Sequence, residues 1–139
     1  MSGLFKRPPA FGLPPGNDDI ADLAERALAA IPAPLAAHVR GVGIAVEDMA
    51  DDETLEELGI DSAWELTGLY RGTPLTRRSV ADAVREPDLI FLYREPILLE
   101  WIESGEDLYR LVRSVLVHEV AHHFGFSDAD IEAIEREMD

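Results

Sequence analysis

The chain has 139 residues, a formal net charge of −16 and no cysteine. This length predicts one domain with its own core, too small for the two-lobed cleft of a large protease. The charge argues against nucleic acid as a partner, because phosphates are normally met by clusters of Lys and Arg, and it favours a basic or neutral partner. The lack of cysteine excludes disulfides and thiolate metal ligands, and it agrees with a cytoplasmic location.

Residues 1–16 are rich in proline and glycine and predict a flexible tail. The tail lacks the apolar core of a secretory signal, and no stretch of the chain is apolar enough to predict a membrane span. Residues 17–139 then form the single predicted domain.

The first half of this domain predicts one helix and one or two strands. Apolar residues at helical spacing predict an amphipathic helix over residues 17–31. Alternation over residues 42–46 predicts a strand, and the acidic stretch 47–57 predicts a surface loop with one short helical turn. Residues 64–70 read as a strand that leads into a turn at residues 71–74.

The second half predicts a strand and several helices. Residues 89–94 predict the best second strand, ended by Pro96. A short helix is expected over residues 97–102, and a capping box at residues 104–107 is expected to open a long helix that runs through Phe124. Helices and strands in this irregular order predict an α+β fold.

The most informative segment is residues 118–128, which read HEVAHHFGFSD. On a helix, His118 and His122 lie about 40° apart around the axis, so both imidazoles can bind one metal ion. Glu119 is placed to hydrogen-bond a metal-bound water without displacing it, as a general base does. The apolar residues around the histidines predict a buried helix, in which a cation would satisfy these polar groups. The alternative is a helix whose histidines only hydrogen-bond to carbonyl groups.

The third metal ligand is less fixed by the sequence than the first two. Gly125 can end the helix in the left-handed conformation, after which Asp128 can supply a carboxylate ligand. However, Ser127 and Asp130 also form a capping box for a last helix, in which Asp128 would simply favour the N-terminus. Other carboxylates nearby are alternative ligands: Asp130, Glu132 and Glu135.

The remaining histidines are expected outside the metal site. His123 lies about 100° around the helix from His122, so it cannot easily share the ion and is expected to pack beside it. His38 is expected to be an ordinary surface or core residue.

Taken together, these segments resemble the small zincin-like metallopeptidases, sometimes described as minimal metalloproteases, over about residues 20–135. The blocks that carry the likeness are residues 68–76, 90–96 and 118–128. The resemblance implies a compact α+β domain whose small mixed sheet packs against the active-site helix and flanking helices. It also implies a zinc ion held by His118, His122 and Asp128. Unlike the larger metzincins, the chain has Asp as third ligand and no methionine turn.

We therefore expect a zinc-dependent peptidase that hydrolyses peptide bonds in peptide or protein substrates. Zinc would activate a water molecule, and Glu119 would accept its proton and pass it to the leaving amine. Tyr70, Tyr93 and Arg94 are candidates for stabilising the transition state, although packing or an ion pair explains each more simply. An extended substrate would add beside an edge strand, for which residues 90–94 are the best candidate.

Two other functions remain open on the sequence alone. One is a metal-dependent hydrolase of an amide, ester or phosphodiester, against which Glu119 and the acidic surface weigh in the case of RNA. The other is a non-catalytic module with a closed zinc site that docks a basic partner, although structural zinc sites usually use cysteine. Manganese, iron or cobalt could also occupy such a ligand set.

Overall fold

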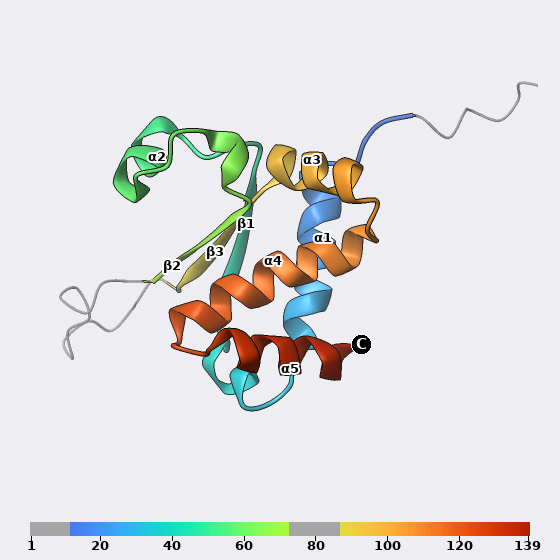
Figure 1. Cartoon of the computed structure of the whole chain (residues 1–139), viewed down its shortest axis with the longest axis vertical. Coiled ribbons are helices and arrows are strands. Elements are labelled where there is room, and N and C mark those ends of the chain that lie inside the picture. Colours follow the sequence, from blue (N-terminus) through green and yellow to red (C-terminus); the bar gives the residue numbers. More distant parts are fainter. Residues whose placement is uncertain (1–11, 73–86) are drawn as a thin grey trace, which may run out of the picture.

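The computed structural model describes residues 12–72 and 87–139, which form an α+β fold (Figure 1). The described α-helices are α1 (Asn17–Ala29), α2 (Asp52–Leu58), α3 (Arg94–Ser104), α4 (Leu108–His123) and α5 (Asp128–Met138). The strands are β1 (Gly43–Glu47), β2 (Gly68–Arg71) and β3 (Leu89–Tyr93). Short 3-10 helices occur at η1 (Leu35–His38) and η2 (Ala63–Glu65). Within the described ranges, no helix is both long and apolar enough to cross a membrane.

The three strands form a mixed sheet in the order β1-β3-β2. β1 runs parallel to β3 and β2 runs antiparallel to it, so Ala45 and Leu69 flank Phe91 from its two sides. β3 is therefore the central strand, and β1 and β2 are the edges. The prediction that residues 90–94 offer an open edge to a substrate is wrong, because both sides of this strand are already paired.

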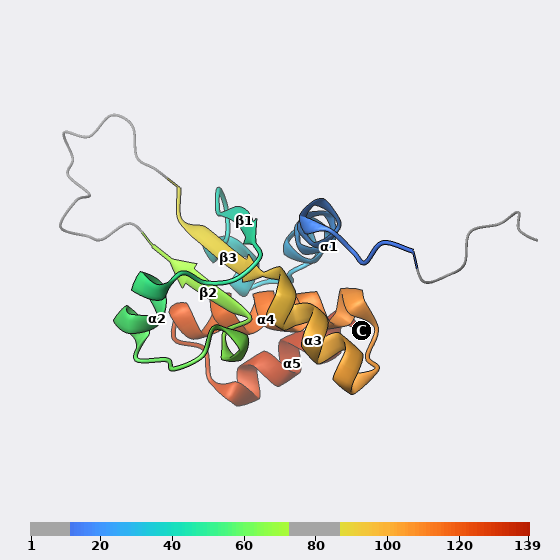
Figure 2. The same ribbon diagram turned by 90° about the horizontal axis from the view of Figure 1, so that it is seen from above.

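The two faces of the sheet pack against different parts of the chain. Ile90 and Leu92 point into the main core, where α1 and α4 cover the sheet. Phe91 and Tyr93 point the other way, into a smaller cluster that includes Leu55 of α2. Figures 1 and 2 show α4 running between the sheet and α5. This arrangement brings one side of α4 against β2 and leaves its other side beside α5.

Most predicted elements in the first half are present, with shifted ends. The helix predicted over residues 17–31 ends at Ala29, and the segment 64–70 contains η2 before β2 begins at Gly68. The predicted single turn in the acidic stretch is the seven-residue helix α2. The side chain of Asp51 caps α2 by accepting a hydrogen bond from the Thr54 N–H at 2.8 Å. The predicted turn at residues 71–74 lies partly outside the described residues.

The second half corrects two predicted boundaries. Pro96 does not end the strand, because α3 begins at Arg94 and Pro96 lies in its first turn, where helical N–H groups have no partner within the helix. α4 is not opened by a capping box at residues 104–107. Its N-cap is Asp107, whose carboxylate accepts a hydrogen bond from the Arg110 N–H at 3.1 Å.

Residues 12–16 lead into α1 and lie against α3. The Arg94 Nε donates a hydrogen bond to the Pro15 carbonyl oxygen at 2.7 Å. Of the tail predicted over residues 1–16, the first eleven residues lie outside the described ranges, so its flexibility stays a prediction.

Candidate active site

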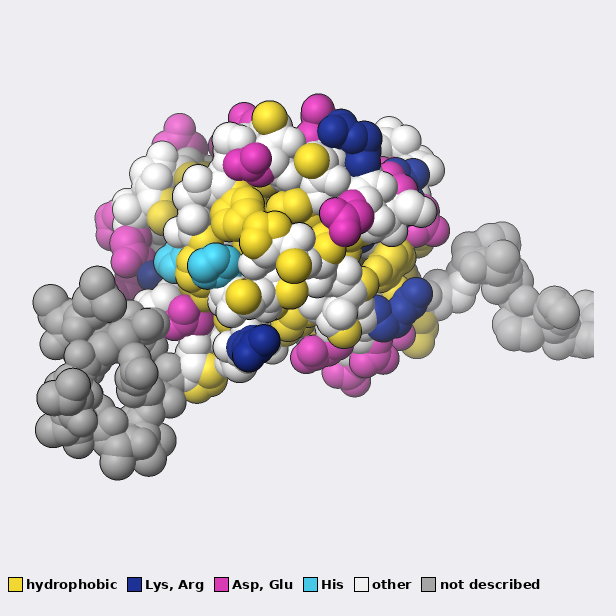
Figure 3. Space-filling model, turned by 90° about the horizontal axis from the view of Figure 1, so that it is seen from below, with side chains coloured by type: hydrophobic (Ala, Val, Ile, Leu, Met, Phe, Trp, Pro, Cys, Tyr) yellow, Lys and Arg dark blue, Asp and Glu magenta, His cyan; other side chains and the backbone are white. Residues whose placement is uncertain are grey.

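The C-terminal half of α4 presents the histidine motif at the surface. Leu116, Val117 and Val120 are buried on the side of α4 that packs into the core. The side chains of His118 and His122, in contrast, are 43% and 52% exposed. Figure 3 shows histidine side chains at the surface of this face. The prediction of a buried helix is therefore right for one side of α4 and wrong for the side that carries the two histidines.

His118 is held in an orientation that suits a metal ligand. Its Nδ1 lies 2.8 Å from the carbonyl oxygen of Ser114, one turn earlier on α4. Because a carbonyl only accepts, Nδ1 carries the proton and Nε2 keeps its lone pair. A hydrogen bond to the ring nitrogen that does not bind the metal is the usual way in which proteins fix the tautomer of a metal-binding histidine. The ring centroids of His118 and His122 are 5.9 Å apart.

Asp128 is brought back to α4 by the turn that follows the helix. Gly125 adopts a left-handed conformation with φ of +84°, as the motif predicted. Ser127 and Asp130 form the predicted capping box of α5. Asp128 is the first residue of α5, and its Oδ1 lies 3.0 Å from the Nε2 of His122. Capping by Ser127 thus leaves the Asp128 side chain available to the histidines.

Glu119 is on α4, and its carboxylate lies against the edge strand β2. Its carboxylate accepts a hydrogen bond from the backbone of Tyr70. Burial raises the pKa of Glu119 above its ordinary value, and this effect outweighs the Tyr70 hydrogen bond and the nearby His122 and His118, which lower the pKa. A carboxyl group with a raised pKa is closer to the range in which a general base works at neutral pH.

The sequence model of the zincin-like metallopeptidase family matches residues 39–138, which span the sheet, α4 and α5. The chain belongs to the zincin-like metallopeptidases. None of the curated proteins compared with the chain matches it. The resemblance that the motifs implied is confirmed, and so is the α+β fold with a small mixed sheet.

The donor groups of this zincin-like site fit a zinc ion in kind. Two imidazoles and a carboxylate are typical ligands of a catalytic zinc, and the His118 tautomer leaves Nε2 for a metal. As the side chains stand, no three His, Asp or Glu groups of the described ranges converge closely enough to hold a metal ion. The Asp128 side chain is 93% exposed and has room to turn from its hydrogen bond with His122 towards a shared ion.

The alternative carboxylates are placed less well for binding a metal. Asp130 accepts the backbone hydrogen bond of Ser127 in the capping box, and Glu132 lies 3.5 Å from Arg136. Glu135 reaches His118, but its Oε1 lies 3.9 Å from Nδ1, the nitrogen that already bonds to a carbonyl. Among these carboxylates, only Asp128 reaches a histidine nitrogen that a metal could use.

The other two histidines make packing contacts, as predicted. The His123 ring stacks on the Tyr70 ring with centroids 3.8 Å apart. His38 stacks on Phe124 at 4.8 Å, which ties η1 to the end of α4. Neither ring is among the groups that face Asp128.

The three candidates for transition-state stabilisation have different surroundings. The Tyr70 hydroxyl donates to Asp88 at 2.7 Å, while its backbone bonds to Glu119. Arg94 binds the Pro15 carbonyl and lies 3.5 Å from Asp48, a role in anchoring the segment before α1. Tyr93 belongs to the cluster on the other face of the sheet. Of the three, Tyr70 alone is linked by a described contact to Glu119.

The sequence did not predict that the edge strand β2 lies beside Glu119. The nearest hint was Gly68, which begins this strand and allows it to approach α4 closely. Sequence alone also did not reveal the Ser114 carbonyl contact, because a backbone oxygen is present whatever the residue type.

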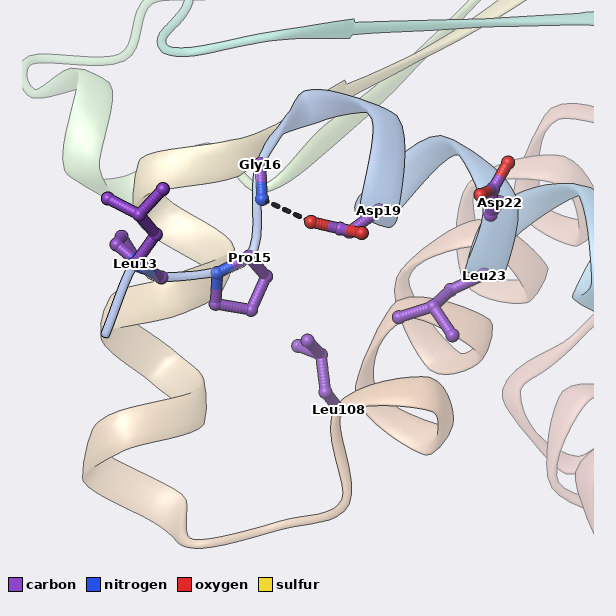
Figure 4. Close-up of a pocket in the computed structure, with 8 residues that line it drawn as sticks. Leu13, Pro15, Gly16, Asp19, Asp22, Leu23 and Leu108 are labelled. Carbon is purple, nitrogen blue, oxygen red and sulfur yellow. Dashed lines mark hydrogen bonds between the residues drawn. The ribbon is translucent and has the colours of Figure 1, made fainter. Parts of the chain in front are cut away.

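A separate pocket of about 610 Å³ lies at the opposite end of α4. Figure 4 shows Leu13 and Pro15 on one side of it and Leu23 and Leu108 on the other. Leu108 is the first residue of α4, roughly 15 Å along the helix from His118 at 1.5 Å per residue. This pocket therefore does not belong to the candidate active site.

Proposed function

We propose that the chain is a zinc-dependent peptidase in which His118, His122 and Asp128 hold the metal and Glu119 is the general base. The observation that carries this proposal is the position of Glu119, between the two histidines of α4 and the edge strand β2. Ligands, base and a strand edge able to pair with a peptide thus lie together. The family match supports a metallopeptidase in general, and the ligands and the base are our assignment.

A zinc ion in such a site supplies Lewis acidity, which polarises the scissile carbonyl and makes a bound water more acidic. Glu119 would accept the proton of the attacking water and return it to the leaving amine. Burial favours this by raising the pKa of the carboxyl, and the Tyr70 backbone hydrogen bond orients it. His118 would be kept in its ligating tautomer by the Ser114 carbonyl.

The edge of β2 would position the substrate. The Tyr93 N–H donates to the Thr67 carbonyl oxygen at 2.9 Å, so alternate residues 67, 69 and 71 direct their backbone groups towards β3. Gly68 and Tyr70 then direct theirs to the open edge, on which the Glu119 carboxylate also lies. An extended peptide that pairs with this edge would bring its backbone next to the base.

The test is metal content and peptide cleavage measured on wild type and on Glu119→Gln. We expect about one zinc ion per chain in both proteins, because the substitution keeps all three ligands. Cleavage of a mixed peptide library should fall by roughly 100-fold or more in the variant, the usual contribution of a general base. Glu132→Gln, on the exposed side of α5, serves as the control and should cleave like wild type. Undiminished cleavage by Glu119→Gln would refute the assignment of the base, and failure of wild type to bind zinc would refute the ligands.

A further inference from the structure

A second polar pocket, of about 380 Å³, lies on the opposite face of the sheet from α4. It is bounded by α2, by the ends of β1 and β3, and by β2. In Figure 1, α2 lies beside β2 and away from α5. The polar and charged side chains that line this α2 pocket are Glu47, Asp51, Glu53, Thr54, Glu57, Arg71 and Tyr93.

The carboxylates of the α2 pocket are only partly neutralised. Arg71 binds Glu57 through two nitrogens, at 2.7 and 3.4 Å. Asp51 is engaged in capping α2. In the part of the chain that the structure describes, the side chains of Glu47 and Glu53 have neither a hydrogen bond nor an ion pair. One guanidinium against four carboxylates leaves the pocket strongly negative.

Tyr93 gives independent support for a ligand at this place. Its side chain lines the pocket although the residue is only 2% exposed. Within residues 12–72 and 87–139 its hydroxyl has no hydrogen-bond partner, and it is not among the buried unpaired atoms, so it is accessible from the pocket. Burial, and after it the nearby Glu47, raises the pKa of Tyr93, so the hydroxyl stays neutral and can accept a hydrogen bond.

The spacing of the carboxylates favours an organic cation over a metal ion. Nowhere in the described ranges do three acidic or histidine side chains converge closely enough to hold a metal. A guanidinium, with five N–H donors in a plane, can reach several separated oxygens at once. Phe91 and Tyr93 add a flat wall, since their rings lie within 10° of parallel with centroids 6.4 Å apart. Arginine commonly stacks on such aromatic faces.

We propose that the α2 pocket binds the guanidinium group of an arginine side chain, supplied by a polypeptide that pairs with the open edge of β2. The occupant rests on the proposed function, because it is the substrate strand expected beside Glu119. Side chains of an added strand point alternately to the two faces of the sheet. Those on the face of Tyr70 would meet α4, and those on the face of Arg71 would meet the α2 pocket.

The first test needs no cleavage. N-acetyl-arginine amide and its neutral isostere N-acetyl-citrulline amide are titrated into the protein while the Tyr93 ring resonances are followed by NMR. We expect the arginine compound to bind roughly tenfold or more tightly, because charge-assisted hydrogen bonds are about twice as strong as neutral ones. Equal affinity for the two compounds, or no shift of Tyr93, would overturn the proposal.

Variants then separate the pocket from the general negative charge of the protein. Glu47→Gln/Glu53→Gln should lose most of the preference for arginine over citrulline. Glu25→Gln/Glu100→Gln removes the same charge from exposed positions on α1 and α3 and should keep the preference. If both double variants lost this preference equally, only the net charge would matter, and the proposed site would be refuted.

Arg71→Gln is expected to have the opposite effect, because it should strengthen binding of the arginine compound. Removing the resident guanidinium frees Glu57, so the variant should bind N-acetyl-arginine amide several-fold more tightly than wild type. Arg71 and Glu57 are 41% and 55% exposed, so breaking their ion pair is expected to leave the fold intact. Weaker binding of N-acetyl-arginine amide by this variant would contradict the proposed binding site in the α2 pocket.

The polypeptide occupant is tested with the Glu119→Gln variant, in which bound peptides should stay intact. Hexapeptides with a central arginine should bind more tightly than their citrulline counterparts and should shift both the Gly68 amide and the Tyr93 ring. A shift of Tyr93 without one of Gly68 would overturn pairing with β2. If wild type cleaves nothing but the arginine hexapeptides bind in this way, the proposed function fails while the pocket and its occupant stand.

Discussion

At the scale of single residues, Asp128 and Asp130 offer a matched test of the metal site. Asp128 lies 3.0 Å from the Nε2 of His122, whereas Asp130 bonds to the Ser127 backbone in the capping box of α5. Asp128→Asn should therefore weaken zinc binding by about tenfold or more, since even groups that only support ligands are worth 10- to 100-fold. Zinc affinity is measured by competition with a chelator of known affinity.

Asp130→Asn is the control for this prediction. It removes a carboxylate of the same size from the same turn, and it should lower thermal stability slightly while leaving zinc affinity within about twofold of wild type. Equal zinc affinity for wild type and Asp128→Asn would show that Asp128 acts only at the helix N-terminus, and the third ligand would have to be sought elsewhere.

At the scale of elements, the close approach of β2 to α4 depends on Gly68. A Cβ at this position would lie 2.7 Å from Cγ1 of Val115 and 3.3 Å from the Phe91 carbonyl oxygen. Val115 is β-branched on a helix and has little rotamer freedom to yield. Gly68→Ala should therefore destabilise the fold by about 1–3 kcal/mol, as overpacked substitutions do. Chemical denaturation measures this, with Gly12→Ala as control because nothing lies within 4 Å of its Cβ. A Gly68→Ala variant as stable as wild type would mean that β2 can move away from α4 without cost.

The same elements show what the sequence could and could not predict. Helical spacing in α1 and the motif in α4 are local patterns, so those helices, the capping box at Ser127 and the turn at Gly125 were predicted correctly. Strand order depends on contacts between distant segments, so the central position of β3 could not be read from its apolar residues. For the same reason the sequence did not connect Glu119 with Tyr70, which is 49 positions away in the numbering.

At the scale of the whole molecule, one buried charge ties α4 to the end of α5. Arg113 is 5% exposed and is the only buried charged residue within the described ranges. Its NH2 group bonds to the Asp139 carboxylate at 2.6 Å, and Arg110 reaches the same carboxylate at 3.1 Å. Its Nε has no hydrogen-bond partner, so within the described residues Asp139 supplies the only ion pair of this cation. The sequence did not signal this contact, because Asp139 is 26 positions away from Arg113.

This ion pair predicts how stability depends on pH. The hydrogen bond from Arg113 is the largest of the effects that hold the pKa of Asp139 below its ordinary value. A carboxyl whose pKa is lower in the folded than in the unfolded protein stabilises the fold above its unfolded pKa, and this contribution disappears as the pH falls through the folded value. Asp139→Asn should therefore lower the melting temperature at neutral pH, and the gap to wild type should narrow in acid, below about pH 4. Thermal melts of both proteins across this range measure the effect.

Glu132→Gln breaks only an exposed pair with Arg136 and should change the melting temperature little at any pH. A gap between wild type and Asp139→Asn that stays constant down to pH 2 would show that the Asp139 side chain stabilises the fold by something other than its charge.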